Sequence, residues 1–326
     1  MLKYHLSKLM ARSEKHIAEK ILDTLAYFDV FSYPLTLDEL LLYTDVRSSE
    51  RTSIDITVKK LAKYRLGGQH KEYVYLGSCP SIVKRRIDGN LKANLRFRQA
   101  RFYSMIISYF PFVRGVFLSG SIAKGFMTDN DDIDYFIITS PGRLWIVRSL
   151  LTLFKKIFLL NSHRNFCINY FVDEKSLYIR EQNRFTATEL AFLVPMYDMG
   201  VYELMISENQ WVRCFYPFYM PGFTGPLRNN YPLVKRISEY FMKGSMFDKL
   251  DRYLQGISQK YIRRKFSHMD KDSFDQAFSI KPHELRFLPN RRQFQILKQF
   301  RRKKQILRKH FETPLFSEEK ICAKQS

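Results

Sequence analysis

Cysteine is scarce in this sequence, and the few cysteines stand far apart. The 326 residues include Cys79, Cys167, Cys214 and Cys322, and none of them forms a Cys-x-x-Cys pair. This spacing predicts neither a zinc site nor a disulfide framework. Because unpaired thiols are typical of reducing compartments, we expect a cytoplasmic protein.

Long apolar runs are also missing. No stretch reaches the roughly 18 apolar residues of a membrane-spanning helix. Lys155 and Lys156 interrupt the best candidate, and residues 1–16 lack the apolar core of a signal peptide. The sequence therefore predicts no transmembrane segment, while peripheral contact with a membrane stays open.

Acidic residues are in the minority. Lys and Arg number 54 against 32 Asp and Glu, which gives a net charge of +22. Such an excess favours polyanionic partners, namely DNA, RNA or an anionic membrane face, and it also attracts NTPs. Charge alone does not choose among these partners. The length and the 45% hydrophobic content suffice for two or three domains.

Two common phosphate-binding patterns are absent from the stretch around which the chain is organised. No Gly-Lys-Ser/Thr follows its first glycine, and no Gly-x-Gly-x-x-Gly occurs in it. The stretch instead combines two apolar runs, a small-residue turn, a short helix start and an Asp-x-Asp. In chain order these are Val116–Leu118, Gly120–Ser121, Ile122–Gly125, Asp132–Asp134 and Tyr135–Ile138. The two runs predict buried strands.

The Asp-x-Asp is a candidate metal site. Side chains alternate along a strand, so we expect Asp132 and Asp134 to point to the same side. Adjacent carboxylates repel each other, and a divalent cation between them removes that cost. Oxygen ligands with substrate phosphates suit Mg²⁺. Gly120 would let a phosphate approach the backbone, and Ser121 could donate its hydroxyl. The alternative is an acidic surface turn between two core strands.

At these residues the stretch resembles the polymerase-β-type nucleotidyltransferases. Their signature is Gly-Ser or Gly-Gly, a gap, and Asp-x-Asp between apolar residues. Gly120–Ser121 and Asp132–Asp134 match it, as do Ala123 and Gly125 within the gap. The clear part covers roughly residues 95–180. The resemblance implies a sheet core that transfers a nucleotide from an NTP to a hydroxyl acceptor, with Mg²⁺ held by the two aspartates. It names neither the NTP nor the acceptor.

The third metal-site residue departs from that family. The family carries a carboxylate on a later strand, which is expected here at Phe166–Val172, but Asn169 stands in its middle. An asparagine can ligate Mg²⁺ but cannot accept a proton. Asp173, near the strand end, is the other candidate, and we place it slightly ahead of Asn169. If neither residue serves, the site is a two-carboxylate variant with reduced or altered activity.

Two basic residues are further candidates for contact with the triphosphate, beside the Gly120–Ser121 turn. Lys124 lies in the short helix that follows this turn. Arg143 stands at the start of a helix expected over residues 143–160, after the turn Ser140–Gly142.

The first 80 residues predict a winged-helix-like domain. Helices are expected over residues 17–30, 37–43 and 49–65, with Thr36 and Glu39 forming a capping box, and a hairpin arm over 70–76. Outside its apolar stripe the third helix carries Arg51, Thr52, Lys59, Lys60, Lys63 and Arg65. In a DNA-binding winged helix this surface lies in the major groove. The alternative is a solvated charged face on a packing module.

The rest of the chain predicts mostly helix. A basic helix over residues 80–112 should pack on the core sheet. After residue 180, Thr186 and Glu189 form a second capping box, and basic helices are expected over 231–268 and 289–310. This basic region would suit an anionic acceptor such as RNA.

Together these patterns predict an α+β fold in three parts. Residues 1–80 form the winged-helix-like domain, 81–180 a small mixed nucleotidyltransferase sheet flanked by helices, and 181–326 a helical, basic region. The expected function is Mg²⁺-dependent nucleotidyl transfer. The alternative is a catalytically weak, nucleotide-sensing regulator that binds nucleic acid through the winged helix. The sequence does not predict the oligomeric state.

Overall fold

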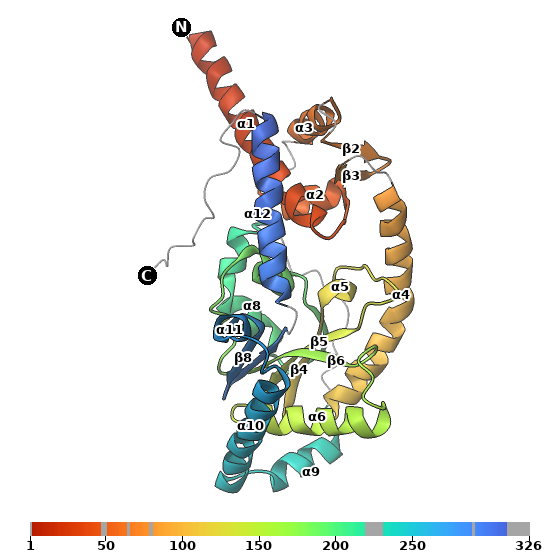
Figure 1. Ribbon diagram of the computed structural model, residues 1–326, viewed down its shortest axis with the longest axis vertical. Coiled ribbons are helices and arrows are strands. Elements are labelled where there is room, and N and C mark those ends of the chain that lie inside the picture. The colour runs from red at the N-terminus through yellow and green to blue at the C-terminus, as the bar shows by residue number, and fades with distance from the viewer. Residues whose placement is uncertain are drawn as a thin grey trace.

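The computed structural model describes residues 2–46, 51–63, 66–77, 81–218, 231–288 and 291–311. The expected α+β class is confirmed: helices surround a six-stranded mixed sheet, and a three-stranded sheet lies among the N-terminal helices (Figure 1). None of the helices in the described ranges is long and apolar enough to cross a membrane. Cys214 is disulfide-bonded, against the expectation, whereas Cys167 is a free thiol.

The N-terminal part contains the three expected helices and a hairpin, although the first helix begins at Leu2 rather than at residue 17. Its elements are α1 (Leu2–Asp29), β1 (Leu35–Thr36), α2 (Leu37–Tyr43), α3 (Arg51–Lys63), β2 (Gly67–His70) and β3 (Tyr73–Leu76), with strand order β1-β3-β2. The capping box is confirmed: the Glu39 N–H donates to Thr36 Oγ1 at 3.1 Å, and the Thr36 N–H donates to Glu39 Oε2 at 2.9 Å. Gly67 and Gly68 begin strand β2.

The remaining elements build the six-stranded sheet and its cover. The helices are α4 (Ser81–Ser108), α5 (Gly120–Ala123), α6 (Leu144–Phe158), α7 (Arg184–Ala191), α8 (Tyr202–Glu208), the 3₁₀ helix η2 (Gln210–Cys214), α9 (Leu233–Phe241), α10 (Ser245–Lys265), α11 (Lys271–Ala277) and α12 (Arg292–Phe311). The strands are β4 (Val113–Ser119), β5 (Asp134–Thr139), β6 (Cys167–Asp173), β7 (Val194–Asp198), β8 (Phe278–Lys281) and β9 (Glu284–Phe287), in the order β7-β4-β5-β6-β9-β8. Only the β5–β6 pair is parallel among these described strands.

The region after residue 180 was expected to be mostly helical, and it contributes strands as well as helices. Strands β7, β8 and β9 come from it, and they extend the sheet on both sides of β4, β5 and β6. Pro195 lies within β7, where it is tolerated because β7 is an edge strand. A boundary at residue 180 therefore cuts through one sheet rather than between two domains.

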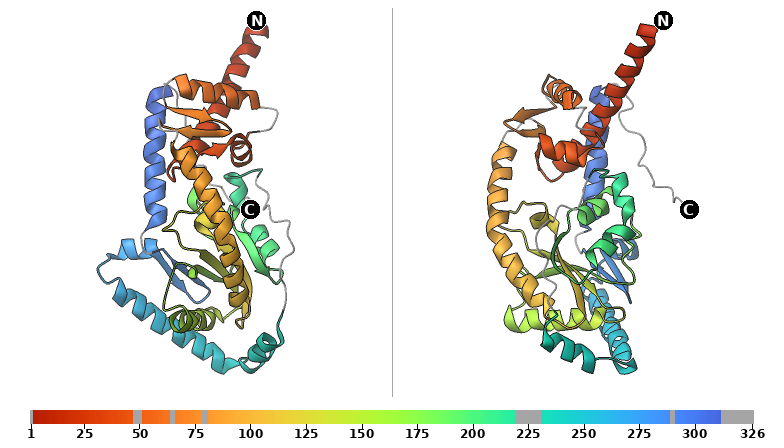
Figure 2. Two further views of the ribbon diagram at one scale, coloured as in Figure 1. Left: turned by 90° about the vertical axis from the view of Figure 1, so that its right-hand side faces the viewer. Right: turned by 180° about the vertical axis from the view of Figure 1, so that it is seen from behind.

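Helix α4 spans the molecule along one side, from the N-terminal elements to α6 (Figures 1 and 2). As expected, it packs on the core sheet, against β4 and β7. Its basic face is partly used inside the structure, because buried Arg86 pairs with Glu39 at 2.6 Å and stacks over Tyr33. Leu91 and Leu95, by contrast, point outward.

Helix α12 returns to the N-terminal part and lies beside α1 (Figure 1). The Phe300 ring packs edge-on against Tyr27 with 5.3 Å between centroids. Lys303 pairs with Asp29, and Lys304 with Asp23 at 2.7 Å. Some of the basic side chains expected to serve an anionic acceptor thus join the two ends of the chain instead.

Candidate functional site

The turn between β4 and α5 requires a glycine. Gly120 has φ +68°, a conformation that side chains other than glycine rarely adopt. Ser119 pairs with Asp134 across the antiparallel β4–β5 ladder. A Cβ atom at position 120 would lie 2.4 Å from Asp134 Oδ2. The strand register therefore brings the predicted Gly-Ser turn and the second aspartate of the Asp-x-Asp together.

Asp134 is an acid in an unfavourable environment. It begins β5, and the amide of Asn169, on the parallel neighbour β6, donates to its Oδ1 at 2.5 Å. The Cys167 thiol in turn donates to Asn169 Oδ1 at 3.2 Å. Desolvation, with a further contribution from the charge of Glu189, raises the pKa of Asp134 to about 7. The carboxyl is therefore poised between its neutral and charged forms at neutral pH.

Glu189 contributes a second carboxylate, which the sequence analysis assigned to a capping box. Its Oε1 pairs with Lys124 Nζ at 2.8 Å, and its Oε2 accepts from the Gly120 N–H at 3.3 Å. Lys124 Nζ also donates to the Gly120 carbonyl at 3.0 Å. Desolvation raises the pKa of Glu189, but Lys124, Arg292 and the Gly120 N–H together outweigh it and hold the pKa below its usual value. Glu189 is therefore ionised at neutral pH.

The predicted capping box at residues 186–189 is wrong because the helix begins earlier. Helix α7 starts at Arg184, and Asn183 caps it by accepting from the Thr186 N–H at 3.0 Å. Asparagine is as good an N-cap as threonine, so Asn183 was the residue in the sequence that could have marked the start of this helix. Glu189 does not cap the helix, and its side chain faces the β4–α5 turn.

These groups line one cavity of about 920 Å³, within the range of small-molecule sites. Its walls come from the N-terminal part, the sheet and α12, and they include Tyr33, Arg85, Ser119, Gly120, Ser121, Lys124, Asp134, Phe136, Asn169, Tyr170, Arg180, Glu189 and Arg292. The Phe136 and Tyr170 rings stack with 4.7 Å between centroids. The Tyr33 hydroxyl donates to the Lys124 carbonyl at 2.8 Å. The N-terminal part thus helps to shape the site.

Five of the predicted site residues meet in this cavity: Gly120, Ser121, Lys124, Asp134 and Asn169. Asp132 does not line it. The strand begins only at Asp134, so the alternation rule that was to place both carboxylates on one side does not reach Asp132. Asp132 is nevertheless a near neighbour, since its charge, after desolvation and Glu189, also raises the pKa of Asp134.

Asp173 and Arg143 lie at the opposite end of the parallel strands. Asp134 pairs with Cys167 at the start of β5 and β6, whereas Asp173 pairs with Thr139 at their end. Asp173 is buried and accepts from the Lys175 N–H at 3.0 Å. Arg143 Nη1 lies 2.5 Å from Asp248 Oδ1. The preference for Asp173 is therefore reversed: Asn169 is the β6 residue that contacts Asp134.

Comparison of the chain with models of protein families, with curated proteins and with solved structures found no match. Nor does any group of three or more His, Cys, Asp and Glu side chains within the described ranges have the arrangement of a metal site.

Proposed function

We propose that the chain is a Mg²⁺-dependent nucleotidyltransferase, which moves a nucleoside monophosphate from an NTP to a hydroxyl acceptor and releases pyrophosphate. The observation that carries the proposal is the contact between the Gly120 turn and Asp134. A Cβ atom at position 120 would collide with this carboxyl, so the close approach requires a glycine. Because the proposed reaction consumes an NTP, we expect the protein to act in the cytoplasm, where NTPs are abundant.

The residues around Asp134 fit a hard divalent cation. A buried carboxyl whose pKa desolvation has raised to about 7 gains stability when a cation binds beside it. Asp134 and its neighbour Asp132 would be the ligands, and Asn169, whose NH2 group donates to Asp134, would position that carboxylate. When bound there, Mg²⁺ would offset the negative charge of the phosphates.

Other cavity residues supply the rest of the proposed site. Ser121 can donate to a phosphate, and Arg292 lies close enough to lower the pKa of both Asp134 and Glu189, although desolvation is the largest influence on each. The Phe136–Tyr170 wall offers an aromatic surface to a base. Glu189 is an ionised carboxylate of the cavity, and we assign it the place of the third carboxylate that was expected at Asp173.

Nucleotide binding tests the proposal without knowledge of the acceptor. We expect a fluorescent, non-hydrolysable NTP analogue to bind in the presence of Mg²⁺, and Asp134→Asn to weaken this binding at least tenfold, a loss of about 1.4 kcal/mol. Turnover, measured as pyrophosphate release, should fall by about a hundredfold or more. Asp173→Asn is the matched control and should behave as wild type. Equal binding by wild type and Asp134→Asn would remove the carboxyl from the mechanism.

A second candidate function is a nucleic-acid-binding regulator with weak catalysis. It is favoured by α3, which exposes Arg51, Thr52, Lys59 and Lys63 and packs against α1 and β2 in a winged-helix-like layout. Binding to duplex DNA should then fall steeply as salt rises. Lys59→Ala with Lys63→Ala should reduce both the affinity and the salt slope, and a flat salt response contradicts this role.

A further inference from the structure

Helix α9 is oriented with its apolar face outward. Its apolar residues recur at helical spacing and form one face, but all of them are between 47% and 74% exposed: Leu233, Val234, Ile237, Tyr240 and Phe241. Lys235 and Glu239, on the opposite face, are 1% and 4% exposed. A surface helix normally does the reverse and buries its apolar stripe.

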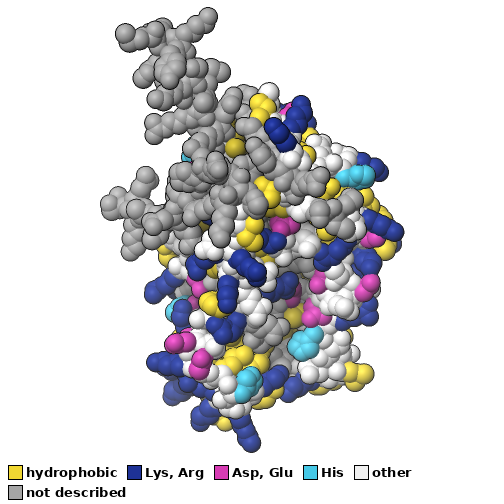
Figure 3. All heavy atoms as spheres, turned by 45° about the horizontal axis from the view of Figure 1, so that its top comes forward, with side chains coloured by type: hydrophobic (Ala, Val, Ile, Leu, Met, Phe, Trp, Pro, Cys, Tyr) yellow, Lys and Arg dark blue, Asp and Glu magenta, His cyan; other side chains and the backbone are white. Residues whose placement is uncertain are grey.

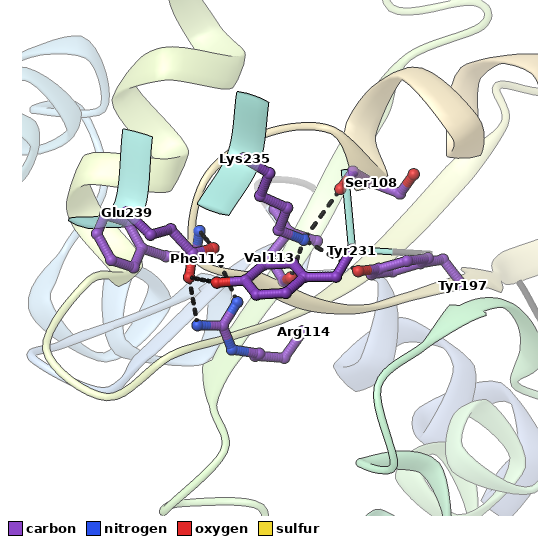
Figure 4. Close-up of polar contacts among 8 residues, drawn as sticks. All are labelled: Ser108, Phe112, Val113, Arg114, Tyr197, Tyr231, Lys235 and Glu239. Atoms are coloured by element: carbon purple, nitrogen blue, oxygen red, sulfur yellow. Dashed lines mark hydrogen bonds and ion pairs between the residues drawn. The ribbon is translucent and has the colours of Figure 1, made fainter. Parts of the chain in front are cut away.

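Lys235 fixes one side of this orientation (Figure 4). Its Nζ donates to the Ser108 carbonyl at 3.0 Å, to the Val113 carbonyl at 2.6 Å and to the Tyr197 hydroxyl at 3.1 Å. An ammonium group has three N–H donors, and each therefore finds an acceptor in the body of the protein.

Glu239 fixes the next turn of the helix (Figure 4). It accepts from the Phe112 N–H at 2.6 Å, from Arg114 at 2.9 and 2.8 Å and from the Tyr231 hydroxyl at 2.6 Å. Because these bonds would be lost on rotation, α9 cannot turn its apolar face inward. The exposed face is built into the fold.

Helix α10 continues the pattern. Apolar residues at intervals of three or four are exposed along it, namely Met246, Leu250, Tyr253, Ile257 and Tyr261. Both helices lie at the end of the molecule away from α1, α2 and α3 (Figures 1 and 2). Large exposed apolar surfaces mark interaction sites in soluble proteins.

The charges on these helices are mostly basic where they face outward. The acids of α9 and α10 are engaged with the body: Glu239 as above, Asp248 with Arg143, and buried Asp251, which accepts from the Trp145 and Ile146 N–H groups at 2.9 and 2.8 Å. The exposed basic residues of the segment are Arg236, Lys243, Lys249, Arg252, Lys260, Arg263, Arg264 and Lys265. Lys and Arg side chains are also spread over the face shown in Figure 3, which tips the opposite end of the molecule toward the viewer.

We propose that α9 and α10 dock on an anionic lipid bilayer surface. A basic helix with an exposed apolar and aromatic face lies in the plane of such an interface, with the apolar side chains at the boundary between headgroups and acyl chains. The basic side chains meet the lipid phosphates, and the tyrosines place a polar tip at headgroup level. Nucleic acid would match the charge but not the aliphatic residues.

Vesicle flotation with the full chain tests this surface. The wild type should float with phosphatidylcholine vesicles that contain phosphatidylserine, and much less with pure phosphatidylcholine or at high salt. Val234→Glu with Phe241→Glu should lower the vesicle affinity by about tenfold or more, because two exposed apolar side chains are replaced by acids.

The matched control is Leu91→Glu with Leu95→Glu on α4, which removes two similarly exposed apolar residues elsewhere and should leave flotation unchanged. Thermal melts of both variants should resemble that of the wild type, since the altered side chains face water. Three outcomes overturn the proposal: flotation that the α9 variant does not change, equal flotation on neutral vesicles, or an α9 variant that breaks a dimer of the wild type without vesicle binding.

Discussion

Two carboxylates that are shielded from water, Asp134 in the cavity and Glu239 beneath α9, are held in opposite ways. Glu239 accepts four hydrogen bonds, which outweigh the desolvation that raises its pKa and leave the pKa below its usual value. Asp134 accepts one from Asn169, and desolvation raises its pKa to about 7. A carboxylate with a structural role has hydrogen-bond partners for its charged form. A carboxylate that binds a ligand lacks some of these partners until the ligand is bound.

The largest effect on stability is expected at the fully partnered site. Glu239→Ala leaves Arg114 without its partner in a largely buried position and should lower the free energy of unfolding by about 3 to 5 kcal/mol. Urea unfolding followed by circular dichroism measures this change. A loss below about 1 kcal/mol would contradict a structural role for Glu239.

The next largest effect is expected at the turn beside Asp134. Gly120→Ala strains a φ of +68° and brings a Cβ to 2.4 Å from Asp134 Oδ2, so it should cost about 2 to 4 kcal/mol and abolish nucleotide binding. Gly142→Ala is the matched control: φ is +65°, but no atom lies within 4 Å of the added Cβ. We expect Gly142→Ala to lower the free energy of unfolding by about 1 kcal/mol, which measures the backbone strain without the close contact. Equal losses in the two variants would argue against a close approach at Gly120.

A smaller effect of opposite sign is expected at Asp134 itself. Asp134→Asn removes a carboxyl that is poorly stabilised when charged, so it should raise the free energy of unfolding at pH 8 by roughly 1 to 3 kcal/mol. Because the pKa of Asp134 rises from 3.8 to about 7 on folding, the native state binds the extra proton between these values. The stability of the wild type relative to the variant should therefore fall as pH rises from 4 to 7. Melts across that range measure the difference, and a constant difference contradicts the raised pKa.

Local signals in the sequence predicted local structure well. The Thr36–Glu39 capping box and the bounds of α2 are confirmed, because each depends on residues within one turn of helix. The meeting of Gly120 with Asp134 was also predictable, since two apolar runs on either side of a small-residue turn favour neighbouring strands.

Features that depend on distant parts of the chain were not predictable. Strands β8 and β9 have four residues each, too few for a clear alternation. Glu189 reaches the site through the packing of α7, and its position in sequence carries no sign of this. For α9 the hydrophobic period predicts a helix but not which face turns inward. That choice depends on partners such as Ser108 and Tyr197, far away in sequence.

The most direct test of the account is the pKa of Asp134, followed by carbon NMR of labelled aspartate with Asp134→Asn to assign the signal. The carboxyl should titrate near pH 7 in the free protein, and the titration should move to lower pH when Mg²⁺ and a non-hydrolysable NTP are added, because a bound cation favours the charged form. A carboxyl that titrates near its ordinary value, or whose titration Mg²⁺ and nucleotide leave unchanged, would contradict the proposed site.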